Sequence, residues 1–241
     1  MRLLAAAILA ALALSPAAFG SGAIEEDSFS FRGIEAVSVN AEFLNVEISG
    51  DDGLAVSMSG ARGCRLLHVV DGSRLKVWLE KDWPLDWPEG GTLSLQCPRG
   101  AGLRIETVTG RIKVEHIESD DCSLRTVSGQ ISVRDSRGTL RAASVSGKVL
   151  LEADQGRMIA KTVSGAIEGH GLAVEEDSSF STISGDVDIR LDAPLDTLRF
   201  DLRSLSGRIV VGNIRAERGL KMGTDGALVR GHSISGALIF R

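Results

Sequence analysis

The sequence predicts an all-β protein built mainly as a parallel β-solenoid, and two observations carry this prediction. A short phrase, Thr or Ser, an aliphatic residue, Thr or Ser, then Gly, recurs seven times between residues 107 and 236, with 18 to 29 residues between successive glycines. No helical period of useful length accompanies it. An interval near 18 residues is too short for a strand-helix-strand unit or a four-stranded propeller blade, but it suits one coil of a β-solenoid.

Residues 1–23 have the layout of a secretory signal peptide. Met1-Arg2 precedes an uncharged apolar run from Leu3 to Leu14, and small residues follow as far as Gly20. The run of about 12 residues is shorter than the roughly 20 that cross a bilayer as a helix. We therefore expect cleavage near Gly20 or Ala23, export to the periplasm or the cell exterior, and no stable membrane insertion afterwards.

Residues 24–100 are predicted to form an N-terminal β-strand cap region that packs on the solenoid. Apolar and polar residues alternate in five segments, as in half-buried strands, and turn residues separate them. These segments are residues 36–39, 44–48, 54–58, 75–79 and 92–96.

A loop within this region holds two of the three tryptophans, Trp83 and Trp87. Pro84 and Pro88 exclude the segment from a sheet interior. Two interpretations stay open: the loop folds back to cap an open end of the core, or Trp83 and Trp87 form an exposed surface for a partner.

Residues 101–241 are predicted to form the repeat β-solenoid. Counting alternation back from Ile131 and Val133 places the aliphatic residue of each phrase on the inward side. The predicted interior column is Val108, Val127, Val145, Val163, Ile183 and Leu205. Val145→Asp is therefore expected to unfold several coils.

The same alternation assigns the other residues of the phrase. It places each Gly inward, where it marks a bend or a close backbone approach, and both hydroxyl residues outward, where they hydrogen-bond between coils. Apolar residues three positions before the column indicate a bend just before each phrase, and hence coils with more than two faces. The last interval, Gly207 to Gly236, is either an extra half-coil or one long coil with a loop inserted around residues 221–231.

The composition points away from several partners. A net charge of −5 with both signs mixed along the chain predicts no basic stripe for nucleic acid and no polybasic segment for anionic lipid. Cys64, Cys97 and Cys122 are an odd number in an export context. They are either a Cys64–Cys97 disulfide with one thiol left over or three small buried hydrophobic residues.

Catalytic and metal-binding patterns are absent from the sequence. The four histidines are isolated, with no His or Cys at metal-ligand spacing. Ser in Val-Ser-Gly is not a nucleophile elbow. The residue after each Gly varies in chemistry, which predicts a solvated column rather than a uniform binding strip: Arg111, Gln130, Lys148, Ala166, Asp186, Arg208 and Ala237. We expect no cofactor, no metal and no enzymatic activity.

The segment from Thr92 to Pro98, running into Leu103-Arg104-Ile105-Glu106 and the Thr-Val-Ser-Gly series, resembles the bacterial putative-adhesin domain, a family of largely unknown function. The strands from Glu35 to Gly50 resemble the strands with which that family's domain begins, so the likeness covers most of the chain after residue 23. The resemblance implies an all-β, solenoid-like fold at the cell envelope and no known catalytic residues.

Two functions are carried forward. The first is an exported, non-enzymatic, adhesin-like scaffold that binds an envelope component or a protein partner. The second is a polysaccharide-active β-helix enzyme, whose catalytic Asp or Glu residues would come from different coils and so form no motif in the sequence. Two or more carboxylates converging in a groove with Arg or Lys would favour the enzyme.

Overall fold

The computed structural model of the chain describes residues 27–61, 64–81 and 90–241, which form an all-β fold with mostly parallel strands. These described residues contain 21 strands, one 3-10 turn at Leu195–Thr197 and no α-helix. The all-β prediction is therefore confirmed.

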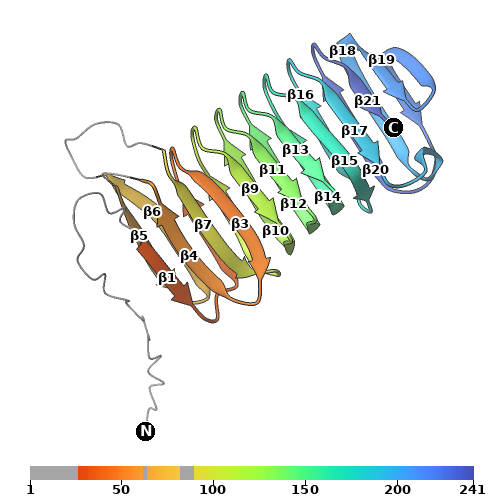
Figure 1. Ribbon diagram of the computed structural model, residues 1–241. Coiled ribbons are helices and arrows are strands. Elements are labelled where there is room, and N and C mark those ends of the chain that lie inside the picture. The colour runs from red at the N-terminus through yellow and green to blue at the C-terminus, as the bar shows by residue number, and fades with distance from the viewer. Residues whose placement is uncertain (1–26, 62–63, 82–89) are drawn as a thin grey trace.

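The described strands join into one hydrogen-bonded sheet. This sheet folds into two facing layers, which we call wall A and wall B, and the strands of each wall are stacked along the molecule (Figure 1). Wall A consists, in stack order, of β5 (Cys64–Asp71), β6 (Arg74–Lys81), β2 (Ala36–Asn40), β8 (Gly102–Glu106), β10 (Glu118–Thr126), β12 (Arg137–Ser144), β14 (Gln155–Lys161), β16 (Ser178–Thr182) and β20 (Leu228–Ser233). Wall B consists of β1 (Asp27–Phe31), β4 (Leu54–Ser59), β7 (Thr92–Pro98), β3 (Asn45–Asp51), β9 (Ile112–Glu115), β11 (Ile131–Arg134), β13 (Val149–Glu152), β15 (Ile167–Val174), β17 (Val187–Leu191) and β21 (Leu238–Phe240). The long strands β18 (Arg199–Val211) and β19 (Ile214–Met222) run through both walls at the far end.

Each repeat contributes one strand to each wall, and we call this pair of strands a rung. Within the repeats, β10 pairs in parallel with β8 and β12, and β11 pairs in parallel with β9 and β13. Leu124 lies opposite Ala142 and Ile131 lies opposite Val149, so neighbouring rungs are offset by one repeat. A rung has two principal strands, in contrast to the predicted coil with more than two faces.

The aliphatic residue of each phrase faces solvent, so the predicted interior column is wrong. The exposed residues, with 41–72% of their surface accessible, are Val108, Val127, Val145, Val163, Ile183, Ile234 and Leu205. Thr126 is buried, whereas Val127 and Ser128 are both exposed, and Gly129 is buried again. Two consecutive outward residues shift the alternation by one, so the turn lies inside the phrase. Parity counted from Ile131 therefore places Val127 on the wrong side.

The first hydroxyl of each phrase lies in the core, and this also corrects the prediction. Thr126 Oγ1 accepts the Gly129 N–H at 3.0 Å and so closes the turn locally. The second hydroxyl is outward as predicted: Ser128 Oγ donates to the carbonyl of Val108 in the neighbouring rung at 3.3 Å. The buried hydroxyls form a column made of Thr107, Thr126, Ser144, Thr162, Thr182, Ser233 and Ser204.

Glycine is required in the phrase by a close approach of two backbones, as predicted. A Cβ on Gly147 would lie 1.7 Å from the carbonyl oxygen of Gly129 in the preceding rung, far inside contact distance. A Cβ on any of the remaining six glycines of the series would also lie too close to a backbone carbonyl oxygen of the neighbouring rung. The phrase is therefore the corner at which successive rungs touch most closely.

The core lies between the walls and consists of aliphatic residues from both. Leu124 and Ala142 of wall A, and Ile131 and Val149 of wall B, are buried representatives. Burial of a Val, Leu or Ile side chain contributes roughly 1.5 to 3 kcal/mol, so the stack derives most of its stability from these columns.

The N-terminal strands add rungs on the outer side of β2 and β3. β2 lies between β6 and β8, and β3 lies between β7 and β9. The chain thus leaves the stack after β3, builds the end rungs, and returns to lay β8 and β9 against β2 and β3. Phe29 and Phe31 of β1 contact the ring of His68 on β5, with centroids 4.4 and 5.1 Å apart, and so link the two walls at this end.

The C-terminal end is built by a second reversal. β18 and β19 form an antiparallel hairpin at the outside, and β20 and β21 return to lie between that hairpin and β16 and β17. The last interval is thus neither a half-coil nor a long coil with an inserted loop: it is a hairpin followed by a full rung wedged inward. Phe240 of that rung packs against Phe180 and Phe200.

Candidate functional site

Trp83 and Trp87, the partner-surface residues predicted from the sequence, lie outside the described residues, as does the predicted signal at 1–23. Their assignment stays a prediction. The division into a cap region and a repeat region at residue 100 is likewise a prediction, although β8 and β9 pair directly with β2 and β3.

The cysteines match the interpretation as small buried hydrophobic residues. All three are buried, and Cys97 and Cys122 are free thiols, so the Cys64–Cys97 disulfide is not formed. Burial raises the pKa of Cys97 to about 11 and that of Cys122 to about 12. Both thiols are therefore protonated at neutral pH and are poor nucleophiles.

Metal-ligating side chains do not gather anywhere in the part of the chain that the structure describes: no group of three or more His, Cys, Asp or Glu has the required geometry. His68 packs against two phenylalanines, and His116 lies 3.9 Å from Asp135 on the exposed surface.

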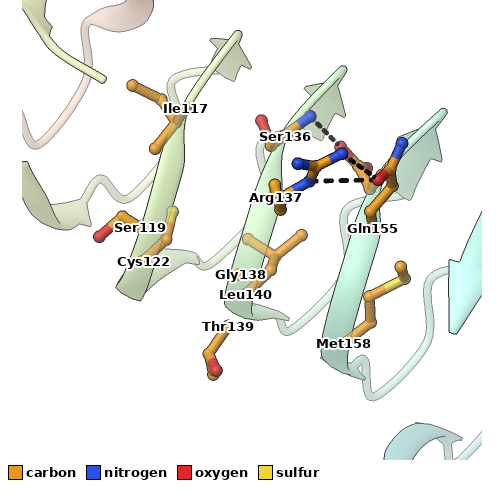
Figure 2. A pocket seen from close by; sticks show the side chains of 11 residues that line it. Ile117, Ser119, Cys122, Ser136, Arg137, Gly138, Thr139, Leu140, Gln155 and Met158 are labelled. Carbon is orange, nitrogen blue, oxygen red and sulfur yellow. Dashed lines mark hydrogen bonds between the residues drawn. The ribbon is translucent and has the colours of Figure 1, made fainter. Parts of the chain in front are cut away.

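A small cavity lies beside β10, β12 and β14, at the corner where the chain passes from wall B to wall A. Cys122, Leu140 and Met158 surround it from three successive rungs (Figure 2). Asp154, which is only 2% exposed, lines it; Oδ1 accepts the Ser136 N–H at 2.9 Å, and Oδ2 has no partner in the described part of the chain. Burial raises the pKa of this carboxyl to about 7.

The size of this cavity decides its role. Its volume is about 10 Å³, which is about the smallest space that admits one water molecule. No substrate fits there, so Asp154 is a structural group that binds the backbone of the preceding rung.

An open groove of about 370 Å³ lies on the outer face of wall B, over β3, β4, β7 and β9. Glu47, Lys113 and Glu115 line it together with serines and Gln96. Lys113 lies opposite Glu47 in the parallel pairing and bonds Glu115 at 2.9 Å. The hydrogen bond from Lys113 lowers the pKa of Glu115, so this carboxylate is ionised rather than held ready as a general acid.

Outward side chains form rows because neighbouring rungs are in register. On wall B one such row is Lys113, Ser132, Leu150, Glu168 and Asp188. Much of the charge on this wall is compensated by ion pairs, including Arg134 with Glu152 and Arg241 with Asp188.

The exposed aliphatic residues of the phrase form another row, which we call the ridge: Val108, Val127, Val145, Val163, Ile183, Ile234 and Leu205, in stack order. Backbone bonds fix this order: the N–H groups of Val127, Ser235 and Ser206 donate to the carbonyls of Val108, Ile183 and Ile234. Parallel strands are about 4.8 Å apart, so seven rungs give a ridge about 29 Å long. Sequence reasoning missed it because it assigned these residues to the core.

Rows of mixed chemistry lie on both sides of the ridge. On the wall A side, two residues before each ridge residue, stand Glu106, Arg125, Ala143, Lys161, Ser181, His232 and Arg203. On the wall B side, after each Gly, stand Arg111, Gln130, Lys148, Ala166, Asp186, Ala237 and Arg208. Taken together the two rows hold six Arg or Lys and two Asp or Glu. Positive and negative residues are mixed along the sequence, but in the folded chain Arg and Lys outnumber Asp and Glu beside the ridge.

Comparison with known proteins agrees with the resemblance drawn from the sequence. The model of the family described as Toastrack DUF4097 matches residues 89–228, which is more than half of the 241 residues. No match was found among curated proteins. Within the described residues, no helix is long and apolar enough to span a bilayer.

Three solved structures are similar to this chain. A putative adhesin from Parabacteroides distasonis ATCC 8503 is 12% identical, with a TM-score of 0.50, and the alignment covers 91% of this chain and 98% of that one. A putative adhesin from Bacteroides fragilis NCTC 9343 is 12% identical, with a TM-score of 0.45 and coverage of 92% and 98%. A putative cell adhesion protein from Clostridium sporogenes ATCC 15579 is 12% identical, with a TM-score of 0.39 and coverage of 90% and 99%. The first of these supports a shared fold and nothing further.

Proposed function

The chain belongs to the Toastrack DUF4097 family, and from that premise we propose that it is an exported, non-enzymatic β-solenoid scaffold that binds an envelope component or a protein partner. The observation that carries the proposal is the set of outward rows held in register by the parallel rungs. A rigid stack repeats the same surface chemistry at a fixed spacing, which suits contact with an extended partner rather than with a small ligand.

The names of similar structures support this direction. Two are called putative adhesins and one a putative cell adhesion protein. The scaffold proposal also accounts for the protonated buried thiols and for a cavity too small for a substrate.

Binding to the envelope is the direct test. The full chain, labelled with a fluorophore, is titrated onto cell envelopes isolated from the organism that encodes it. We expect saturable binding that the unlabelled chain competes away. Linear, uncompeted uptake would contradict the proposal. The double variant Trp83→Ala, Trp87→Ala then shows whether the tryptophan loop takes part in this binding.

Export is tested separately by cell fractionation. The full chain should appear in the exported fraction, and a chain without residues 2–23 should stay in the cytoplasm, because the proposed signal is then missing. Equal distribution of both chains would remove the export part of the proposal and leave the binding part standing.

A second candidate function rests on the wall B groove. Glu47 and Glu115 line this groove together with Lys113, and a polysaccharide-cleaving β-helix would need two carboxyl groups in one groove. The test is release of reducing ends from envelope polysaccharides. Activity lost in both Glu47→Gln and Glu115→Gln, with Ser132→Ala as the control, would support the enzyme. The ion pair that lowers the pKa of Glu115 argues against it.

A further inference from the structure

The ridge is an exposed apolar feature that the fold itself does not require. The turn needs an inward hydroxyl and a glycine, because Thr126 Oγ1 accepts the Gly129 N–H and a Cβ at Gly129 would meet the backbone of the preceding rung. The aliphatic residue that follows the inward hydroxyl points to solvent, where a polar residue would serve the same turn. All seven phrases nevertheless carry Val, Ile or Leu there. Contiguous exposed apolar rows of this kind mark interaction sites.

The charge beside the ridge indicates the chemistry of what it contacts. Cations stand on both sides: Arg125, Lys161 and Arg203 towards wall A, and Arg111, Lys148 and Arg208 towards wall B. Three of them have a carboxylate partner, namely Arg125 with Glu106, Lys148 with Glu168 and Arg203 with Asp201. Arg111, Lys161 and Arg208 form no ion pair with any described residue.

The shape of the ridge limits the partner further. It is an exposed outer corner of the stack, about 29 Å long, and not a groove, so it can lie against a surface but cannot enclose a ligand. A row of aliphatic side chains with cations on either side matches the interface of an anionic bilayer, where apolar groups enter the headgroup region and Arg or Lys contact phosphates.

From these observations we infer that the ridge docks this protein on the surface of a membrane containing anionic lipid. The inference rests on the proposed function, because it names the envelope component that the scaffold binds. The contact is peripheral: the seven aliphatic side chains enter the headgroup region, and the flanking cations bind lipid phosphates. Glu42, which occupies the ridge position next to Val108, ends the apolar row at the N-terminal side.

Other occupants fit less well. A second copy of the chain would bring two sets of six cations against each other across the ridge. An added β-strand would find few free backbone groups, because carbonyls such as that of Val108 already accept N–H donors from the next rung. A sugar chain usually stacks on aromatic rings, and the ridge has none.

The test is co-sedimentation of the full chain with vesicles of phosphatidylcholine alone and with vesicles containing 30% phosphatidylglycerol, a composition chosen as about that of an anionic membrane. We expect binding to the anionic vesicles that weakens at least about tenfold on removing the negative lipid or on raising the salt to about 0.5 M. All proteins compared carry the same residues 1–26, so a difference in vesicle binding between variants comes from the ridge and not from these residues.

Three variants locate the contact. The triple variant Val127→Ser, Val145→Ser, Val163→Ser removes exposed apolar groups and should fold normally while binding at least about tenfold more weakly. A second triple variant, Arg125→Gln, Lys148→Gln, Lys161→Gln, should also bind anionic vesicles about tenfold more weakly. Arg134→Gln, Arg190→Gln, Arg241→Gln removes the same charge from wall B and should bind anionic vesicles as the parent does.

The outcomes separate the two proposals. Binding to envelopes without binding to protein-free anionic vesicles would overturn the membrane inference and leave the scaffold function intact. So would ridge variants that sediment with vesicles as the parent does, or ultracentrifugation showing that the ridge instead joins two copies. Absence of binding to envelopes and vesicles alike would overturn both.

Discussion

The middle of the stack and its two ends use the same walls but different chain paths. From β10 to β17 each strand pairs in parallel with its counterparts one repeat away. At the ends the pairing turns antiparallel: β1 with β4, β5 with β6, and β18 with β19. The repeated phrase thus specifies how one rung lies on the next, whereas each end of the stack requires strands that do not follow the phrase.

The edges show what this difference achieves. A parallel edge strand would present unpaired backbone groups to another chain. β19 is mostly exposed and carries Arg215, Glu217, Arg218 and Lys221, and β1 is only five residues long. Short or charged edge strands resist edge-to-edge pairing, so β1 and β19 protect the edges that they form.

The largest expected effect separates the inner and outer sides of the middle rung. Val149→Asp buries an unpaired carboxylate between the walls and should unfold the chain, at a cost of more than about 4 kcal/mol. Val145→Asp, four residues earlier on the ridge, should change the free energy of unfolding by less than about 0.5 kcal/mol. Thermal melts of both variants check this reversal of the sequence-based prediction. Equal loss in the two would mean that the ridge residue is part of the core.

A backbone contact should give the next largest effect, and it contrasts the middle with an end. Gly147→Ala places a methyl group 1.7 Å from the Gly129 carbonyl oxygen and should cost at least about 3 kcal/mol. Gly53→Ala, in the turn between β3 and β4 near the N-terminal end, meets nothing within 4 Å and should be almost neutral. Urea midpoints compare the pair. A neutral Gly147→Ala would show that the rungs can move apart at their corner.

Asp154 should make the middle of the stack sensitive to pH. The folded carboxyl has a pKa of about 7, whereas that of the unfolded chain titrates near about 3.9. Between these values the folded state holds a proton that the unfolded state has released, so the free energy of unfolding falls as the pH rises from about 4 to about 7, on the order of a few kcal/mol.

The matched variant for this pH effect is Asp154→Asn, which keeps an oxygen for the Ser136 N–H and cannot ionise. Urea unfolding at pH 4.5 and pH 7.5, values chosen as roughly the two limits of that window, should show the parent losing stability relative to the variant at the higher pH. A constant difference between the two proteins would rule out a shifted carboxyl at this corner.

The smallest effect tests the buried hydroxyl column. Ser144 Oγ accepts the Gly147 N–H at 2.7 Å inside the core, so Ser144→Ala leaves a buried donor unsatisfied and should cost about 1 to 2 kcal/mol. Ser146→Ala, on the exposed side of the same phrase, should cost less than about 0.5 kcal/mol. Denaturant titrations resolve this difference, and a neutral Ser144→Ala would mean that the hydroxyl column does not stabilise the turn.

The sequence predicts the larger features of the fold well because they depend on spacing. The interval between glycines near 18 residues corresponds to the offset between paired strands, and the close approach at Gly147 follows from glycine standing on the inward side. The side on which Val127 lies depends on a turn that places two residues outward in succession. Alternation alone carries no signal for such a phase shift, so the ridge was missed together with its flanking cations.

The path of the chain at the two ends of the stack could not be predicted from the sequence either. Seven similar phrases suggest seven rungs in chain order, yet Ile234 lies between Ile183 and Leu205. Which rung neighbours which is decided by how the hairpin β18–β19 and the phenylalanines Phe180, Phe200 and Phe240 pack, and those contacts join residues far apart in the chain.

The wedged position of β20 and β21 sets an order of assembly. A chain emerging from its N-terminus makes β16 to β19 before the strands that must separate them, so β18 cannot take its final partner until residue 240 has been synthesised. Until then β16 and β18 each present an open parallel edge. The final rung therefore closes this end of the stack only after the strands on both of its sides have been made.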